Sequence, residues 1–586
     1  MRYVDELTGA LKAQLSIAYR TKDLLAYGLR RRLREGYSSL DFRADARAAL
    51  AVSALGIPMA IALAITLGVA PQYGLYTAVV AGLACALLGG SPAQVTGPTA
   101  AMVVVILPIL HKLGFGGLLV AGAMAGALLV VMGLARMGRF LQFIPHPVTT
   151  GFTSGVAVVI VLLQLRPLLG LPVGSSESVL AQVAQVARSL SGVNGWELLV
   201  GATTLVALLG IPRVTRRVPA TLTALALVSL LVLAAGSLIP DFHVATIGGT
   251  FSSSVDGHVI RGIPPLPPLP LVPWHLEHAP VLSYEVIREL LPSAFAIAAL
   301  AAIESLNTAM MVDGVSGSKH DPNAELIALG IANMVCPFFG GIAASGAVAR
   351  TAANLRTGAR SPLAAALQSV IILAGVIVLA PLMSYLPLAA LAAMMLVLAR
   401  NQSEILHFLR LARIGQRSDV LVMFTCFVLT VAFDMVLAVT VGVVLAALLF
   451  MRRMAVLTKV VLDTRSTETY SLPPGVRLYE VAGPLFFGAA KSAMDALHNS
   501  DHTARLLILS MKHVPTIDAT GLVAVESVLE RLQRSKTHVI LAGLQAEVAE
   551  LLERAGIRRV PGRLSIAPDV ETAVSMAIVH AAHSGS

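Results

Sequence analysis

The chain has 586 residues, of which 56% are hydrophobic and only 13% are charged, and its formal net charge is +10. Soluble enzymes do not have this composition, so that class is excluded and a polytopic membrane protein is expected. The basic residues are dispersed among short loops, which argues against a nucleic-acid partner and fits attraction to anionic lipid head groups.

Apolar runs suited to crossing a hydrocarbon core, about 20 residues each, lie between residues 48 and 451 and none follows. Together with shorter runs between them they predict 14 membrane elements. The elements are 48–69, 74–88, 97–110, 116–134, 148–165, 197–211, 218–239, 290–312, 325–340, 345–355, 362–382, 387–399, 419–433 and 435–451. The third and the tenth are too short to span a bilayer.

Lys and Arg precede the first element and follow nearly every even-numbered one, as on the cytoplasmic side of a membrane protein. We therefore expect a multi-pass inner-membrane protein with both termini cytoplasmic. A loop of about 240–283, rich in Pro and Ser, is expected outside. The N-terminus lacks the pattern of a removable signal peptide. The cysteines Cys85, Cys336 and Cys426 stand singly in apolar segments, so we expect neither a metal nor another cofactor.

Two similar stretches lead into the short elements. GGSPAQVTGPTAAM at 89–102 and GGIAASGAVARTAA at 340–353 both begin with Gly-Gly and end with Thr-Ala-Ala. The third and tenth elements occupy matching positions if the 14 elements form two repeats of seven. Because seven is odd, the two repeats have opposite orientations in the membrane. A helix that starts inside the membrane directs unpaired N–H groups and a positive dipole end at an anion. The sequence thus predicts an anion site between Gly97-Pro98-Thr99 and Ser345-Gly346-Ala347.

Two ionisable residues stand in these segments at high energetic cost. Glu304, in AIESLNTAMMVDG, is expected to carry a proton or, alternatively, to cap a neighbouring helix as a structural carboxylate. Arg350 follows the second half-helix start and can bind an oxyanion bidentately. Alternatively, the side chain of Arg350 extends to the cytoplasmic membrane interface, as those of Arg356 and Arg360 are expected to do.

Several motifs resemble the SulP anion transporter family. They are IPMAIALAI, PQYGLYTAVVAG, GPTAA, GFTSG, AIESL, DGVSGSKHDPNAELIALGIAN and ARTAANLRTGARSPL. The resemblance implies an α-helical polytopic fold of 14 segments in two inverted repeats, with a core domain of segments 1–4 and 8–11 and a gate domain of segments 5–7 and 12–14. It also implies a small anion bound between the half-helices and an elevator movement of the core.

The tail after the last element alternates short strands at 478–487, 505–511 and 538–543 with helix-like stretches at 488–498, 521–535 and 546–555. This α/β pattern resembles the STAS domain that ends most family members. Asp518 and Thr520, in VPTIDATGL, match the D-x-[ST]-G motif that is phosphorylated in anti-sigma antagonists, although helix capping is the simpler interpretation. The tail contains no catalytic constellation.

We therefore expect a cytoplasmic segment at 1–47, a transport domain at 48–455 and a cytoplasmic STAS domain at 460–586. The STAS domain is expected to serve homodimer contacts, trafficking and a cytoplasmic protein partner.

The family comparison also bears on the coupling ion and the substrate. Sodium-coupled bicarbonate members have Asp where Glu304 stands and a Thr ligand where Val348 stands, while Thr308 remains. Proton coupling or uncoupled transport is therefore expected in preference to sodium symport. Met59 stands where many sulfate-type members have Gln. With the last two segments, this departure resembles bacterial C4-dicarboxylic acid transporters, so proton-coupled uptake of succinate, fumarate or aspartate is expected. The alternatives are sulfate or bicarbonate transport and, in another class, a sensor or scaffold that does not transport.

Overall fold

The computed structural model describes most of the chain in two compact units, Met1–Val443 and Val444–Ser586. The described residues are 24–139, 145–171, 179–215, 219–255, 258–276, 283–433, 435–457, 459–462, 472–486, 504–535 and 537–584.

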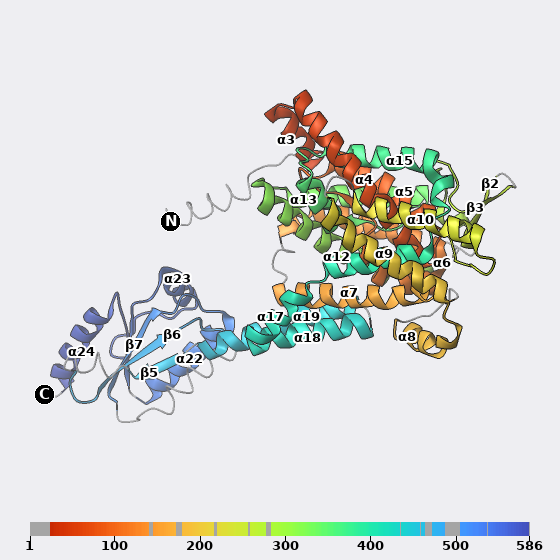
Figure 1. The fold of residues 1–586 in the computed structure, drawn as a ribbon. Coiled ribbons are helices and arrows are strands. Elements are labelled where there is room, and N and C mark those ends of the chain that lie inside the picture. Colours follow the sequence, from red (N-terminus) through yellow and green to blue (C-terminus); the bar gives the residue numbers. More distant parts are fainter. Residues whose placement is uncertain are drawn as a thin grey trace. The chain divides into compact units, whose positions relative to one another are not determined.

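The first unit is a bundle of long apolar helices (Figure 1). Among the described residues, 10 helices are long and apolar enough to cross a membrane. The helices that correspond to the expected elements are α4 (Ser39–Leu67), α5 (Pro71–Leu88), α6 (Ala100–Leu134), α7 (His146–Leu168), α9 (Gly195–Val214), α10 (Ala220–Leu238), α12 (Tyr284–Ser316), α13 (Pro322–Val335), α14 (Val348–Arg356), α15 (Leu363–Met383), α16 (Leu388–Gln402), α18 (Arg417–Ala432) and α19 (Met435–Leu457). The third and fourth elements form the single helix α6, which is interrupted at Gly114 where φ is 68°.

The helices pack in two groups, and this packing confirms the expected fold. In one group α12 and α13 pack on α6, while α15 packs on α4 and α5. In the other group α7 packs on α16 and α18, and α9 packs on α10 and α16. The first group contains segments 1–4 and 8–11 and is called the core group below. Each group combines elements from both halves of the chain, as two interlocked inverted repeats require.

Some elements of the first unit were not predicted from the sequence. They are α3 (Tyr27–Glu35), α8 (Val179–Arg188), α11 (Ile247–Thr250), α17 (Ile405–Ile414) and the hairpin of β2 (Ser252–Val255) and β3 (His258–Arg261). The arginines of α3 and α17 led us to interpret both segments as basic loops. Both are amphipathic helices, with the arginines interspersed among apolar residues. In Figure 1, α3 lies at one end of the bundle and the hairpin at the other.

The second unit contains a five-stranded sheet in the order β5 (Lys459–Leu462), β6 (Val476–Ala482), β7 (Leu506–His513), β8 (His538–Ala542) and β9 (Leu564–Ala567). The first pair is antiparallel and the other pairs are parallel. Alternate side chains of β7 enter two apolar cores, one with α22 (Ala519–Arg534) and α23 (Ala546–Arg554), the other with α24 (Val570–Ser584). The expected α/β domain is therefore present. The predicted strands correspond to β6, β7 and β8, and the helix expected at 488–498 lies outside the described residues.

Candidate anion-binding site

The two segments that precede the half-helices cross each other inside the core group. Thr96 and Gly97 form β1, Ser345 and Gly346 form β4, and the two short strands pair antiparallel. Gly97 lies opposite Ser345 in this register. The structure thus brings together two stretches about 250 residues apart, as the sequence predicted.

Each crossing segment ends where a helix begins, and no side chain caps either helix start. Thr99 is the N-cap of α6, yet its hydroxyl makes no capping bond. The N-cap of α14 is Ala347, which has no side-chain acceptor. The first N–H groups of both helices therefore lack the side-chain acceptor that an N-cap normally supplies. Each helix start contributes roughly half a positive charge.

Glu304 of α12 binds the hydroxyl groups at this crossing. Its Oε2 accepts a hydrogen bond from Thr99 Oγ1 at 2.8 Å and another from Ser345 Oγ. The two hydroxyl oxygens are 2.8 Å apart. The carboxylate therefore lies beside both helix starts and uses both hydroxyl donors of the crossing. A role limited to capping a helix does not describe these contacts.

Arg350 lies behind the crossing and is completely buried, with 0% of its surface exposed. Its Nη2 donates to Pro98 O at 2.7 Å, while Nε and Nη1 have no hydrogen-bond partner among the described residues. The interpretation of Arg350 as a cytoplasmic interface arginine is therefore wrong. A buried guanidinium with donors left over needs a nearby negative charge, which Glu304 or a bound anion supplies.

Glycines allow this close packing. A Cβ on Gly97 would lie 2.8 Å from Arg350 Nη1, and one on Gly346 would lie 2.8 Å from Ser305 Cα. Contacts of this length do not occur for real side chains, so any larger residue would displace the guanidinium or the α12 backbone.

The other predicted residues belong to α12, α4 and α14. Thr308 Oγ1 donates to Gly346 O at 3.2 Å and to Glu304 O at 2.7 Å, which holds α12 against β4. Met59 is buried on α4, three residues after Gly56, whose added Cβ would lie 3.7 Å from Arg350 Cδ. Val348, the first residue of α14, is 37% exposed and offers no oxygen ligand.

Three buried polar residues near the crossing, Gln94, Ser305 and Gln368, were not predicted from the sequence. Gln94 Nε2 donates to Ser305 Oγ at 2.6 Å and thereby joins the first crossing segment to α12. Gln368 Nε2 would lie 3.0 Å from a Cβ on Gly56, close to Arg350. An amide side chain inside an apolar segment is costly, and that cost was the available signal for both glutamines.

The candidate residues of the tail form a separate feature in the second unit. Asp518 is the N-cap of α22, and its Oδ1 accepts a hydrogen bond from Gly521 N at 2.7 Å. The capping interpretation of Asp518 is therefore confirmed. Thr520 is exposed in the first turn of the same helix. Its phosphorylation stays a prediction.

Comparisons with known proteins agree with this architecture. Residues 42–426 match the Sulfate permease family, and residues 470–573 match the STAS domain. The chain is 36% identical over 530 residues to the putative sulfate transporter YvdB of Bacillus subtilis, covering 89% of this chain and 95% of that protein. It is 27% identical over 550 residues to the bicarbonate transporter BicA of Picosynechococcus sp., covering 89% and 92%.

Two solved structures have similar folds. The structure of SLC26A9 superposes with a TM-score of 0.79 at 18% identity, covering 100% of this chain and 96% of that one. The transmembrane domain of a cyanobacterial BicA superposes with a TM-score of 0.58 at 26% identity, covering 70% and 98%.

Proposed function

The chain belongs to the sulfate permease (SulP) family and is a multi-pass membrane anion transporter, not an enzyme; from this premise we propose that it carries a compact dianion of the sulfate type, together with a proton bound by Glu304. The observation that carries the proposal is the position of the Glu304 carboxylate, which accepts both hydroxyl donors of the crossing. An incoming anion needs these donors, so Glu304 must release them. Protonation removes the charge that holds it there.

The charges around the crossing favour a dianion once Glu304 is protonated. The two helix starts contribute about one positive charge in total, and Arg350 contributes another. An ionised Glu304 cancels about half of this sum, and a protonated one cancels none. Sulfate, with two negative charges on one small group, balances the protonated site. We therefore propose that the proton and the anion are bound together.

The compactness of this site does not support the earlier expectation of a C4-dicarboxylate. A dicarboxylate places its two charges several ångströms apart, whereas Arg350 lies directly behind Gly97 and Pro98 at the same crossing. The relatives named above are a putative sulfate transporter and a bicarbonate transporter. Both lines of evidence favour the alternative substrates, sulfate or bicarbonate, over succinate, fumarate or aspartate. Bicarbonate, a monoanion, matches the charge of the site less well.

The coupling ion and the movement are also parts of the proposal. A hard cation such as sodium needs oxygen ligands, and Val348 places an apolar side chain at the start of α14. We propose proton coupling, an elevator movement of the core group, a homodimer and cytoplasmic termini at the inner membrane.

The test is uptake into proteoliposomes that contain the full chain. Labelled sulfate, bicarbonate and succinate are offered separately, with an inward proton gradient or without one, and with or without sodium. We expect sulfate uptake to be concentrative only with the proton gradient and to be indifferent to sodium. Preferred uptake of succinate, or acceleration by sodium alone, would overturn the proposal.

A further inference from the structure

A second basic cavity lies where α3 meets the core group. Its volume is about 170 Å³, and its lining includes Arg31, Arg32, Lys319 and Arg360. The cavity also contacts residues 90, 92 and 93, which lead into β1, and Leu355 near the end of α14. It is separate from the Glu304 site but touches the segments that connect to both half-helices.

Helix α3 is fixed to the core group by its backbone. Ala26 N donates to Leu88 O at 2.8 Å, and Gly28 N donates to Gly89 O at 3.0 Å. A Cβ on Gly28 would lie 2.7 Å from Ser91 O, so only glycine allows this approach. The side chain of Leu24, just before α3, is buried against α13. One wall of the cavity is therefore the N-terminal helix and the other is the core group.

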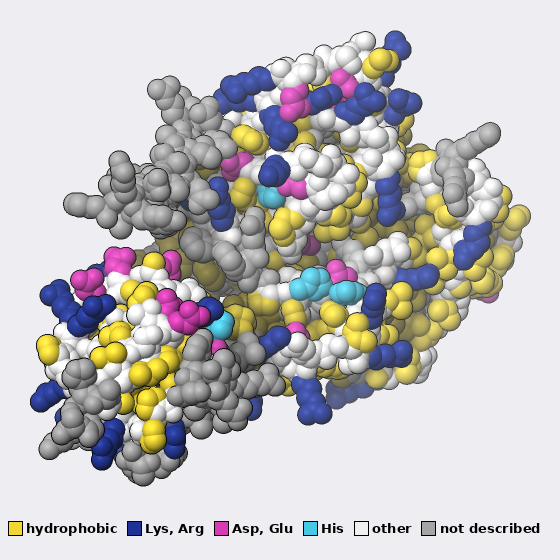
Figure 2. All heavy atoms as spheres, turned by 90° about the vertical axis from the view of Figure 1, so that its left-hand side faces the viewer, with side chains coloured by type: hydrophobic (Ala, Val, Ile, Leu, Met, Phe, Trp, Pro, Cys, Tyr) yellow, Lys and Arg dark blue, Asp and Glu magenta, His cyan; other side chains and the backbone are white. Residues whose placement is uncertain are grey.

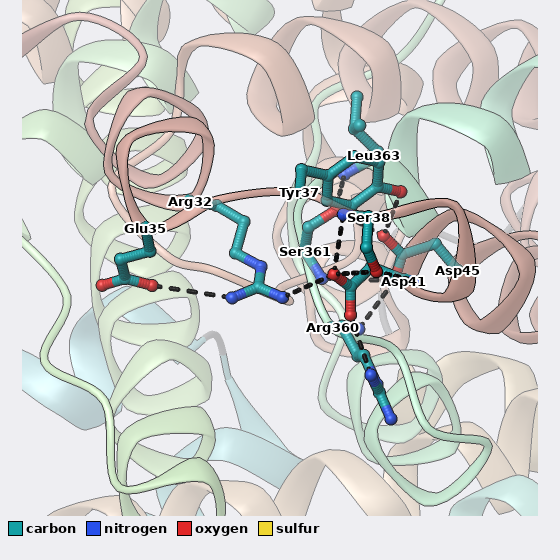
Figure 3. Close-up of polar contacts among 9 residues, drawn as sticks. All are labelled: Arg32, Glu35, Tyr37, Ser38, Asp41, Asp45, Arg360, Ser361 and Leu363. Atoms are coloured by element: carbon teal, nitrogen blue, oxygen red, sulfur yellow. Dashed lines mark hydrogen bonds and ion pairs between the residues drawn. The ribbon is translucent and has the colours of Figure 1, made fainter.

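A polar network between α3, α4 and the loop before α15 fixes two of the arginines (Figure 3). Asp41 accepts from Arg360 Nη1 at 2.8 Å and pairs with Arg32 Nη2 at 3.2 Å. Asp45 is completely buried and accepts from Tyr37 Oη at 2.8 Å and from Arg360 N at 2.6 Å. Burial, aided by this bond, raises the pKa of Tyr37 to about 12, so the phenol stays a donor.

The lining carries more positive than negative charge. Four cations line the cavity, and three carboxylates contact them: Glu35 pairs with Arg31 and Arg32, Asp41 pairs with Arg32 and Arg360, and Asp45 accepts from Arg360 N. Lys319 is exposed, and its carbonyl already accepts from Arg31 Nη1. Arg32 Nε is buried without a hydrogen-bond partner among the described residues. Buried donors are normally satisfied, so this nitrogen and the excess charge both call for an anion.

We propose that this cavity binds a phosphate group, either on a lipid head group or on a small soluble phosphate ester. Its volume is below the roughly 300–1,000 Å³ of sites that enclose a drug-sized ligand, which limits the occupant to one small polar group. Arginine forks match phosphate oxygens bidentately, and Lys319 adds a point charge. Such an occupant binds α3 to the core group and crosslinks the segments that lead into the transport site.

The surroundings suit a position at the level of lipid head groups. Leu33 of α3 and Leu40 and Phe42 of α4 are exposed, close in sequence to the arginines. These residues precede the apolar part of α4, which begins near Ala48. Figure 2 shows basic side chains with a few acidic ones among them over the upper end of the molecule, where α3 lies in Figure 1. A lipid phosphate is the source that this arrangement favours.

The test measures hydrogen exchange of the α3 amides in the full chain, with two probes. One probe is sn-glycerol 3-phosphate added to protein in phosphatidylcholine nanodiscs, and the other is phosphatidic acid incorporated into the nanodiscs. Protection by phosphatidic acid alone identifies a lipid source, and protection by glycerol 3-phosphate as well identifies a phosphate ester. Protection by neither probe would overturn the proposal.

Variants distinguish specific binding of phosphate in this cavity from non-specific electrostatic attraction of phosphate to α3. Arg31→Gln and Lys319→Gln change exposed side chains of the lining, so the fold is retained, and each should weaken the response by up to about fivefold. Arg34→Gln is the matched control, since Arg34 is an exposed arginine of the same helix and not part of the lining. Equal weakening by Arg34→Gln would show non-specific electrostatics and would overturn the proposal.

Discussion

Glu304→Gln separates the charge of this residue from its shape. A glutamine keeps the size of Glu304 but lacks the negative charge that holds the hydroxyls of Thr99 and Ser345 on Oε2. It cannot ionise and it cannot carry a proton. On the proposed mechanism the variant is permanently in the form that binds the dianion. We therefore expect it to exchange sulfate across the membrane at all pH values and to lose proton-driven accumulation.

The size of the effect follows from the hydroxyl geometry. An anion held by the hydroxyls of Thr99 and Ser345 lies about two hydrogen-bond lengths, roughly 6 Å, from the carboxylate. At an effective dielectric constant of about 20, two unit charges at this separation repel by about 3 kcal/mol. Sulfate experiences this repulsion twice and nitrate once. The ionised carboxylate should therefore disfavour sulfate relative to nitrate by about 100-fold.

The assay compares inhibition of labelled sulfate exchange by unlabelled sulfate and by nitrate. At about pH 8 the ratio of their inhibition constants should shift about 100-fold toward sulfate in Glu304→Gln, and on acidification the wild type should approach the variant. The matched control is Glu289→Gln, which removes a carboxylate of the same helix that pairs with Lys112 at 2.8 Å. An unchanged ratio in a folded Glu304→Gln protein would refute an ionised Glu304 beside the anion.

Further predictions concern other parts of the molecule. Gly97→Ala should weaken sulfate binding by at least about tenfold because its Cβ would lie 2.8 Å from Arg350 Nη1, whereas Gly314→Ala, in open space on α12, should be neutral in the same binding assay. A chain ending after Leu457 should keep the sulfate-to-nitrate preference and lose rate or amount; a changed preference would show that the tail shapes the site. Burial lowers the pKa of His538, so the unfolded STAS domain binds more protons than the folded one; its free energy of unfolding should fall as pH decreases through about 6.5, measured by exchange of the β8 amides, and His538→Asn should abolish this dependence. Thr520→Glu should alter partner binding by the STAS domain, measured by pull-down, without altering sulfate affinity, since Thr520 is an exposed residue of the second unit.

The membrane fold could be predicted from the sequence because hydrocarbon leaves the chain few choices. Apolar length identified the spanning helices, and the two Gly-rich stretches identified the half-helices before any contact was known. Amphipathic helices were the weak point. In α17 the arginines outweighed the apolar periodicity, so the segment was interpreted as a loop, although Phe408 is buried. Strand β9 and helix α24 were missed because their patterns are short or weakly periodic.

The site was predictable in its location and less so in its chemistry. Glu304 and the half-helix starts were identified because charge and broken helices are costly in a membrane. The environment of Arg350 could not be predicted. A residue five positions after Ser345 on a short helix can lie either at the membrane interface or in the protein interior. Only the three-dimensional contact with Pro98 and Gly97 decides between them. That contact lies across about 250 residues of sequence and leaves no local signal.

Glu304 and Arg350 are opposite charges at the same crossing, and this gives a physical reason for linking the proton to the anion. Arg350 is completely buried, so moving the core group without a compensating negative charge would be costly. When the site is empty, an ionised Glu304 supplies that charge. When Glu304 is protonated, the bound anion must supply it instead. Reciprocity then requires the anion to strengthen proton binding by the same factor by which the proton strengthens anion binding. A core group that has bound only the proton leaves Arg350 unpaired, and this state is the one that a coupled transporter has to avoid.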